Sequence, residues 1–429
     1  MKTKEDYQMK KLVALLLAAV MVLGLVACGG NNTQETAAPQ AGNNAPAEGQ
    51  VEQVHLKVWV PEEEMEIAKA MCEAFDEYYE QFECTFDISV TGIDLSANGL
   101  ETDPELAADV FQLPSGSIAQ LTNAGLLYPI TANIDAVKGL YGEGAIEASS
   151  LGGYMYGVPF SPNSWFMYYN KDMYTEEEVK SLDAMMAKDL GEGVQNFSCD
   201  IDNGWYIEAF FYATGATLFG ADGTDPTNMT WNSANGVAAA NYIIDLVNNP
   251  KYLEDKDGIA GAMMKEGKLG ALSSGTWAYP DLYEVMGDKL GAVALPTITV
   301  DGKECQLSNF ADYKVWSVKS NTKHPMAAQL LAEWLANEEN QMTRYQVAGA
   351  SPTCLSLLTN PDVASNVAAT ALIAQTQYAT PQPSIAQIAN YWTPAQALGT
   401  EILSGAANKD NIQAKLDQLC ADVTATLAG

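Results

Sequence analysis

The stretch that decides the fold is LGGYMYGVPFSPNSWFMYYNKD, residues 151–172. It contains two runs rich in Val, Phe, Trp and Tyr, which favour strands. Between them lies Ser161-Pro162-Asn163-Ser164, and proline confines a strand to edges or interruptions. Two strands joined by a polar, proline-bearing break indicate one chain crossing between two lobes. On these residues alone an ordinary edge hairpin is the alternative, because short apolar runs are ambiguous.

The spacing of Tyr156-Gly157, Pro159 and Tyr169-Asn170-Lys171-Asp172 carries a first family resemblance. It resembles the crossover segment of bacterial extracellular solute-binding proteins of the maltose/maltodextrin-binding type, which serve ABC sugar importers. The resemblance extends over residues 50–429 through four further segments: 109–130, 264–277, 324–354 and 383–392. The last one, PSIAQIANYW, resembles the maltodextrin-binding branch in particular, although Ala386 stands where that branch typically has a second proline.

The opening of the globular region predicts an α/β fold. HLKVWV (55–60) alternates as a strand, a helix follows to about Tyr79, and CTFDISVTG (84–92) is the next strand. Further along, helices are expected over 176–190 and 233–249. The resemblance implies a two-lobe, periplasmic-binding-protein-like fold with discontinuous domains joined by hinge crossovers. The expected bounds are an N-terminal lobe of 50–161 plus 309–357, a C-terminal lobe of 166–303 plus 362–429, and hinge crossovers at 162–165, 304–308 and 358–361.

The N-terminus has the features of an exported lipoprotein. Lys10-Lys11 precede the apolar run of residues 12–27, which is typical of a signal peptide and shorter than the ~20 residues of a membrane span. Leu25-Val26-Ala27-Cys28 resembles a lipobox, which implies removal of residues 1–27 and lipidation of Cys28 at the extracellular face of the cell membrane. A plain signal peptide with a chance cysteine is the alternative, and Met1 or Met9 could start the chain. Residues 28–50, rich in Gly, Asn and Ala, are expected to form a flexible linker.

Charge and cysteine content exclude several classes of function. A net charge of −32 disfavours nucleic acid and anionic bilayers, since binding either needs clustered Lys and Arg. There is no CxxC motif and there are two histidines in all, so no zinc site is expected, and we predict neither a metal nor a cofactor. Cys72 and Cys84 are close enough in sequence to pair, but isolated buried thiols are equally compatible with the residues.

The candidate ligand residues follow from the chemistry of sugars. Aromatic rings cover the apolar C–H faces of a sugar, and a few polar groups in a cleft bind its hydroxyls. Where resemblance and residue type agree, the stacking candidates are Trp277, Trp392, Trp205 and Tyr391, with Tyr279 as a further cleft residue. The hydroxyl-binding candidates are Glu62, Glu63, Glu64 and Asn163, and also Gln112, which falls where maltose binders carry a Trp.

The leading interpretation is a lipid-anchored, monomeric binding protein that hands an oligosaccharide, in particular a maltodextrin, to ABC transporter permease subunits. Ligand would contact both lobes in the closed state and shift the population toward closure. A different oligosaccharide is the first alternative. An extracellular glycoside hydrolase would need two carboxylates across a cleft. A surface adhesion or signalling protein without a transporter is a third alternative, and a binder of peptides or polyamines is a fourth.

Overall fold

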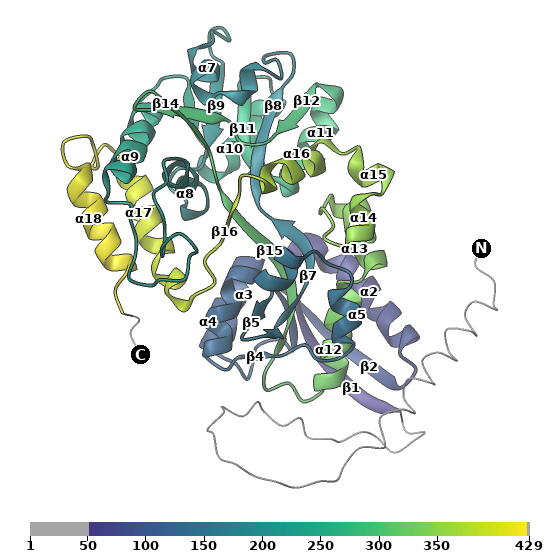
Figure 1. The fold of residues 1–429 in the computed structure, drawn as a ribbon. Coiled ribbons are helices and arrows are strands. Elements are labelled where there is room, and N and C mark those ends of the chain that lie inside the picture. Colours follow the sequence, from purple (N-terminus) through teal and green to yellow (C-terminus); the bar gives the residue numbers. More distant parts are fainter. Residues whose placement is uncertain (1–50, 427–429) are drawn as a thin grey trace. The chain divides into compact units, whose positions relative to one another are not determined.

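The computed structural model describes residues 51–426, which contain two large β-sheets with helices packed on them (Figure 1). The expected signal peptide, the lipidated Cys28 and the linker lie outside the described residues. Within residues 51–426, none of the helices is long and apolar enough to cross a membrane.

The first sheet has seven strands, and its order along the main path is β16-β15-β3-β1-β2. Strands β2 and β3 run parallel to β1, so the predicted strand–helix–strand opening is confirmed. The long strand β15 pairs antiparallel with both β3 and β7, and also contacts β4 and β16. The members are β1 (Glu52–Val60), β2 (Phe82–Val90), β3 (Val110–Pro114), β4 (Leu127–Tyr128), β7 (Gly157–Asn163), β15 (Phe310–Lys319) and β16 (Thr380–Pro381).

The second sheet has five strands in the order β10-β9-β11-β8-β12. Strands β9, β10 and β11 are mutually parallel, whereas β8 runs antiparallel between β11 and β12. The members are β8 (Trp165–Asn170), β9 (Gln195–Cys199), β10 (Tyr252–Glu254), β11 (Leu269–Gly275) and β12 (Leu290–Val293). Two small hairpins add β5 (Ser150–Leu151) with β6 (Tyr154–Met155), and β13 (Thr297–Val300) with β14 (Lys303–Gln306).

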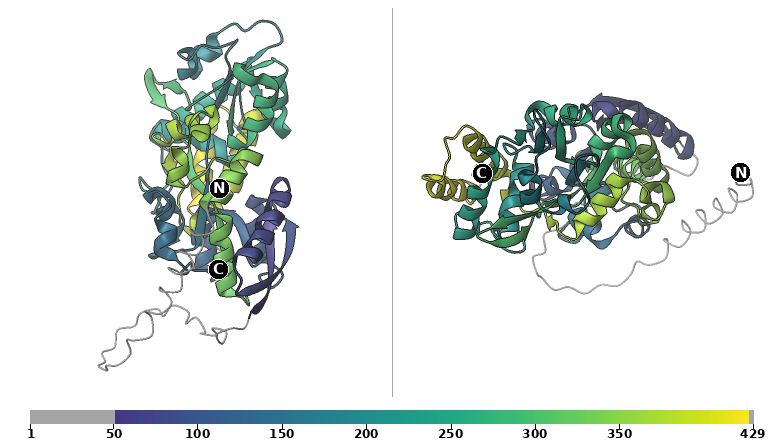
Figure 2. Two further views of the ribbon diagram at one scale, coloured as in Figure 1. Left: turned by 90° about the vertical axis from the view of Figure 1, so that its right-hand side faces the viewer. Right: turned by 90° about the horizontal axis from the view of Figure 1, so that it is seen from above.

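Helices cover both sheets. Helices α2 and α12, which are far apart in the sequence, lie side by side against the first sheet (Figures 1 and 2). The α-helices are α2 (Met65–Tyr78), α3 (Ile93–Thr102), α4 (Ile118–Asn123), α5 (Ile134–Lys138), α6 (Glu143–Ala148), α7 (Leu182–Ala187), α8 (Gly204–Ala213), α9 (Ala234–Val247), α10 (Ile259–Lys265), α11 (Tyr279–Met286), α12 (Pro325–Leu335), α13 (Glu338–Ala348), α14 (Leu355–Leu358), α15 (Pro361–Ala364), α16 (Val367–Thr376), α17 (Trp392–Leu403) and α18 (Ile412–Val423). The 3-10 helices are η1 (Glu62–Glu64), η2 (Ser115–Ser117), η3 (Glu178–Lys180), η4 (Lys256–Gly258), η5 (Thr276–Ala278), η6 (Gly287–Lys289) and η7 (Ala386–Asn390).

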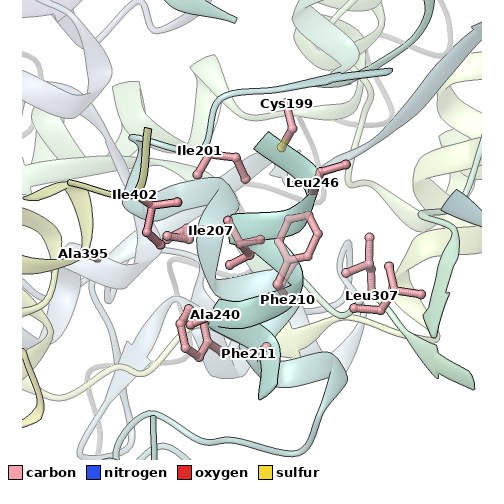
Figure 3. Close-up of a cluster of buried hydrophobic side chains, with 14 of the residues drawn as sticks. Cys199, Ile201, Ile207, Phe210, Phe211, Ala240, Leu246, Leu307, Ala395 and Ile402 are labelled. Atoms are coloured by element: carbon pink, nitrogen blue, oxygen red, sulfur yellow. The ribbon is translucent and has the colours of Figure 1, made fainter. Parts of the chain in front are cut away.

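Helix α8 is at the centre of the largest apolar core, which belongs to the second sheet. Figure 3 shows Phe210 and Phe211 of α8 among side chains of α9 and α17. The sequence of α8 is hydrophobic nearly all round, which is typical of a helix buried on most sides. The buried ring of Trp231 stacks on Phe211 with 3.7 Å between ring centroids.

The quoted stretch 151–172 contributes to both sheets. Strand β7 belongs to the first sheet and β8 to the second, with Ser164 between them. The stretch is therefore a crossover between the sheets and not an edge hairpin, as the proline-bearing break between its two strands predicts. The lobe boundaries given above remain our proposal.

The crossovers meet at Asn309, whose side chain is fully buried. Its amide nitrogen donates to the Ser164 hydroxyl at 3.0 Å and to the Trp165 carbonyl at 2.7 Å, and its amide oxygen accepts from Gln375. The backbone N–H of Thr380 donates to the Asn309 carbonyl. Through its side chain and its backbone carbonyl, Asn309 thus links residues 164–165 with residues 375–380.

Two local expectations need correction or remain open. The single helix expected over 176–190 is wrong: η3 and α7 are separated by Ser181, which is extended, bridges to Thr297 and caps α7 by accepting from the Ala184 N–H. Tertiary pairing therefore overrides the helical periodicity. Cys72 and Cys84 are both free thiols in the structure.

Candidate functional site

The parallel strands bring chemically useful residues to the carboxyl edge of each sheet. In α/β sheets, ligands bind outside the carboxyl ends of parallel strands. In the second sheet, Asp200 follows β9, Asp255 follows β10, and Trp277 follows β11. In the first sheet, Glu62 lies just beyond β1 and Asp94 lies beyond β2 in α3.

A pocket of about 310 Å³ lies at the carboxyl edge of the second sheet, between the turn after β9 and the start of α17. The Asn203 side chain caps α8 by accepting from the Trp205 N–H, and its amide donates to Asp200 at 2.9 Å. One aromatic ring and several hydroxyl-binding groups thus face a common space. The lining residues are Asp200, Asp202, Asn203, Gly204, Trp392 and Gln396.

Within residues 51–426, the pocket residues Asp200 and Asp202 and the neighbouring Glu254 form no ion pair with a cation. Desolvation by burial, reinforced by the neighbouring Asp202, raises the pKa of Asp200 to about 6. Burial also raises the pKa of Glu254 to about 7, against hydrogen bonds from the Tyr252 hydroxyl and the Ile201 N–H. Burial therefore moves the titration of both carboxyl groups from the acidic range toward neutral pH.

Carboxylate oxygens of Asp200, Asp202 and Glu254 lie within 4.8 Å of one another. Oxygen donors at this spacing suit a hard divalent cation. Acidic groups gather in the same way without an ion, so the cluster does not by itself define a metal site.

The aromatic residues beside the pocket divide into ligand candidates and core residues. Trp392 and Trp205 are both half-buried, with ring centroids 6.3 Å apart. Tyr391, by contrast, is fully buried, and its hydroxyl donates to the Gly204 carbonyl at 2.7 Å. The expectation that Tyr391 contacts ligand is therefore wrong: its ring fixes α17 against α8, which places the neighbouring Trp392 at the pocket.

Trp277 is the most exposed of the predicted stacking residues, with 45% of its surface accessible. It lies in η5, directly after β11. A Cβ on residue 275 would lie 2.0 Å from its Cζ3 atom, so Gly275 is what lets the indole lie against the backbone. Tyr279 is half-buried and stacks on Tyr283 rather than on Trp277, with centroids 5.1 Å apart.

Two of the predicted hydroxyl-binding residues of the first sheet form a buried network instead. Glu64 accepts from Gln112 at 2.7 Å and from the Arg344 Nε at 3.0 Å. Gln112 and Arg344 are each 1% exposed, and Glu64 is 7% exposed. The guanidinium of Arg344 lies over the rings of Phe160 and Trp316. The expectation that Glu64 and Gln112 contact ligand is therefore wrong in this structure, because both side chains are buried and bonded to each other.

The other polar candidates remain accessible. Glu62 and Glu63 are exposed in η1. Asn163 is half-buried at the end of β7 and donates to the buried Asp312 at 2.8 Å. Their roles in ligand binding stay predictions.

Sequence reasoning did not single out Asp200, Asp202 and Gln396 at the pocket, nor Asp94 and Lys314, which lie at the carboxyl edge of the first sheet. The signal for three of them was present: Asp200 and Asp202 follow a strand, and Asp94 follows another, so parallel pairing alone puts them at the carboxyl edges. Gln396 lies one helical turn after Trp392 and so shares its face. Nothing in the sequence around Lys314 marks it, because strand residues of mixed type surround it.

Comparison with known proteins agrees with this architecture. Residues 70–371 match the model of the bacterial extracellular solute-binding protein family, and the chain belongs to that family. It is 27% identical over 421 residues to the galactooligosaccharide-binding protein of Bacillus subtilis, covering 93% of this chain and 94% of that protein. It is 25% identical to the maltodextrin-binding protein MdxE of the same organism, covering 92% and 93%.

A solved structure gives the same picture. The maltodextrin-binding protein MalE1 from L. casei BL23 without ligand superposes with a TM-score of 0.76 at 25% identity, covering 87% of this chain and 99% of that one. The expected two-lobe fold of periplasmic binding proteins is thereby confirmed. The family and these relatives are binding proteins, and two different oligosaccharide classes occur in their names.

Proposed function

We propose that this chain is a lipid-anchored extracellular protein that binds an oligosaccharide of the maltodextrin type and delivers it to the permease subunits of an ABC transporter. The observation that carries the proposal is the pocket in which Trp392 lies beside Asp200, Asp202, Asn203 and Gln396. A flat ring supplies apolar area for one sugar face, and the carboxyl and amide groups bind hydroxyls at its edge.

A galacto-oligosaccharide is the second candidate ligand. The relative with 27% identity over nearly the whole chain is named for that ligand. The two sugar classes differ in the orientation of their hydroxyls, and the polar side chains of the pocket would distinguish them by hydrogen bonding. The ring of Trp392 can stack on either class of sugar.

We propose that the ligand acts by shifting the population between two arrangements of the lobes. A ligand can do this only if it contacts one arrangement better than the other. The candidates at the carboxyl edges of both sheets, Trp392 and Trp277 in one and Glu62 and Glu63 in the other, would provide that difference.

Isothermal titration of residues 50–429 with maltotriose, longer maltodextrins, galacto-, xylo- and fructo-oligosaccharides tests the proposal. We expect saturable binding of maltodextrins and a loss of at least about 30-fold in Trp392→Ala, because a central aromatic contact contributes about 2 kcal/mol or more. Tyr78→Ala, which removes an exposed ring on α2, is the control and should bind as the wild type does.

Three other outcomes are informative. Selective binding of galacto-oligosaccharides would replace the ligand and keep the role. Absence of binding to every saccharide would contradict the proposal. Continuous heat with consumption of the saccharide would point to hydrolysis instead.

The membrane anchor is a separate part of the proposal. Expression of the full chain should yield a protein in the membrane fraction whose N-terminal peptide begins at Cys28 and carries lipid. Cys28→Ala should release the protein from the membrane, and mass spectrometry of the N-terminal peptide distinguishes lipidation from plain cleavage.

A further inference from the structure

The structure holds an unusual contact between the two sheets. The ammonium nitrogen of Lys314, in β15 of the first sheet, lies over the indole of Trp277 at 5.8 Å from the ring centroid. Lys314 is opposite Pro114, the last residue of β3, in the sheet register. It therefore lies at the carboxyl edge of the first sheet, as Trp277 does in the second.

The N–H donors of the Lys314 ammonium form no hydrogen bond with the described residues. A lysine carries three N–H donors and no acceptor. In residues 51–426 the interactions of its ammonium are the indole of Trp277 and an electrostatic attraction to Asp94. Neither provides a hydrogen bond, although the lysine is half-buried.

Asp94 and the acidic groups of the pocket set the chemistry around this lysine. Desolvation raises the pKa of Asp94, and Lys314 opposes that rise. Glu62 and Glu63 are exposed at the same edge of the first sheet, and Asp200 and Asp202 lie at the edge of the second. An anionic ligand would meet these carboxylates, so the environment favours an uncharged ligand rich in hydroxyl oxygens.

We infer that Lys314 is a specificity-determining residue of the ligand site, which donates to the hydroxyls of a neutral sugar ring stacked on Trp277. This inference rests on the proposed function. It means that the first sheet contributes a hydrogen-bond donor, Lys314, to the sugar that stacks on Trp277. In the structure the ammonium covers part of the indole, so a sugar stacked on Trp277 would displace it from the ring and receive its hydrogen bonds. The gain in hydrogen bonds then offsets the lost cation–π contact.

The experiment compares Lys314→Met, Lys314→Arg and Lys57→Met in residues 50–429. Methionine keeps the length and apolar stem of lysine but removes the charge and the donors. Lys57 is a half-buried lysine of β1 in the same sheet, whose ammonium donates to the Leu106 carbonyl, and it serves as the matched control. Thermal unfolding of each variant checks that the fold is kept.

With the oligosaccharide that the wild type binds best, we expect Lys314→Met to bind at least about tenfold more weakly. Lys314→Arg should stay within about threefold, because the guanidinium keeps charge and donors, and Lys57→Met should be unchanged. Equal affinity in the wild type and Lys314→Met would overturn the inference while leaving the proposed function intact. If the wild type binds no oligosaccharide, the proposed function fails and the specificity role fails with it.

A second readout needs no ligand. The difference in fluorescence between the wild type and Trp277→Phe isolates the Trp277 emission. Iodide is attracted by the neighbouring ammonium, so its quenching of that emission at low ionic strength should fall in Lys314→Met and persist in Lys57→Met. Quenching that is the same in all three proteins would show that Lys314 does not lie at Trp277, and would overturn the inference without reference to any sugar.

Discussion

Carboxylates occur in two contrasting environments in this protein. At the first sheet, Glu64 is buried, paired with Arg344 and hydrogen-bonded to Gln112. At the second sheet, Asp200 borders a pocket, accepts from Asn203, has no cationic partner in the described part of the chain and has a raised pKa. Both lie just beyond a strand, so position in the fold does not distinguish them. What distinguishes them is burial with a cation: Glu64 is enclosed beside Arg344, whereas Asp200 borders a pocket that a ligand can enter.

The strongest way to break this comparison is Arg344→Met. It leaves Glu64 buried without its cation, and removing one partner of a buried pair typically lowers the free energy of unfolding by about 3–5 kcal/mol. Urea denaturation measures the loss. The double variant Arg344→Met with Glu64→Leu should recover most of it, because an apolar pair of similar volume needs no charge compensation. A loss below about 1 kcal/mol in the single variant would contradict a structural role for the network.

Asp200→Asn should act in the opposite direction on stability. The folded protein disfavours the charged carboxylate, so the neutral amide should raise the free energy of unfolding at pH 7.5 by about 1 kcal/mol, allowing for the solvent that reaches a partly exposed group. Oligosaccharide binding should weaken about tenfold, because one of the two acceptor oxygens becomes an amide donor. Asp410→Asn, an exposed aspartate outside the pocket, is the control. If Asp200→Asn lowers the free energy of unfolding, Asp200 has a structural role like that of Glu64.

The pH dependence of stability sharpens the same contrast through Glu254. Its folded pKa of about 7 lies above the ordinary value of 4.5, so between these values the folded state holds a proton that the unfolded state releases. Its contribution to stability is full below pH 4.5 and is lost as the pH rises through 7. Glu254→Gln has no such proton, so its stability relative to the wild type should increase from pH 4.5 to 7.5. A constant difference in urea midpoint over that range would refute the raised pKa.

The smallest effect is expected for an exposed ion pair. Lys409 and Asp245 approach to 2.6 Å, but their side chains are 52% and 65% exposed. Lys409→Met should change the free energy of unfolding by less than about 1 kcal/mol, and less at high salt. A cost similar to that of Arg344→Met would mean that burial is not what separates the two pairs.

The sequence predicted the elements better than it predicted the site. Alternating strands and the crossover at Ser164 follow from local patterns, and β1, β2 and α9 lie close to their expected bounds. Ser181 shows where this fails: its pairing with Thr297 interrupts a helical pattern that is locally sound. At the site, residue type alone could not separate Tyr391 from Trp392, since adjacent rings on a helix point to different surroundings. Nor could it show that Arg344 reaches Glu64 across 280 residues of sequence.

Strand β15 has a consequence for the order in which the chain can fold. It pairs with β3 on one side and with β7 on the other, and both of these strands are synthesised well over a hundred residues earlier. The second sheet, by contrast, is formed entirely by strands between Trp165 and Val293. During synthesis, all strands of the second sheet are therefore available while β3 and β7 of the first sheet still lack β15, the strand that lies between them. The strand pairing of the first sheet is therefore completed later than that of the second, because it must await residues 310–319.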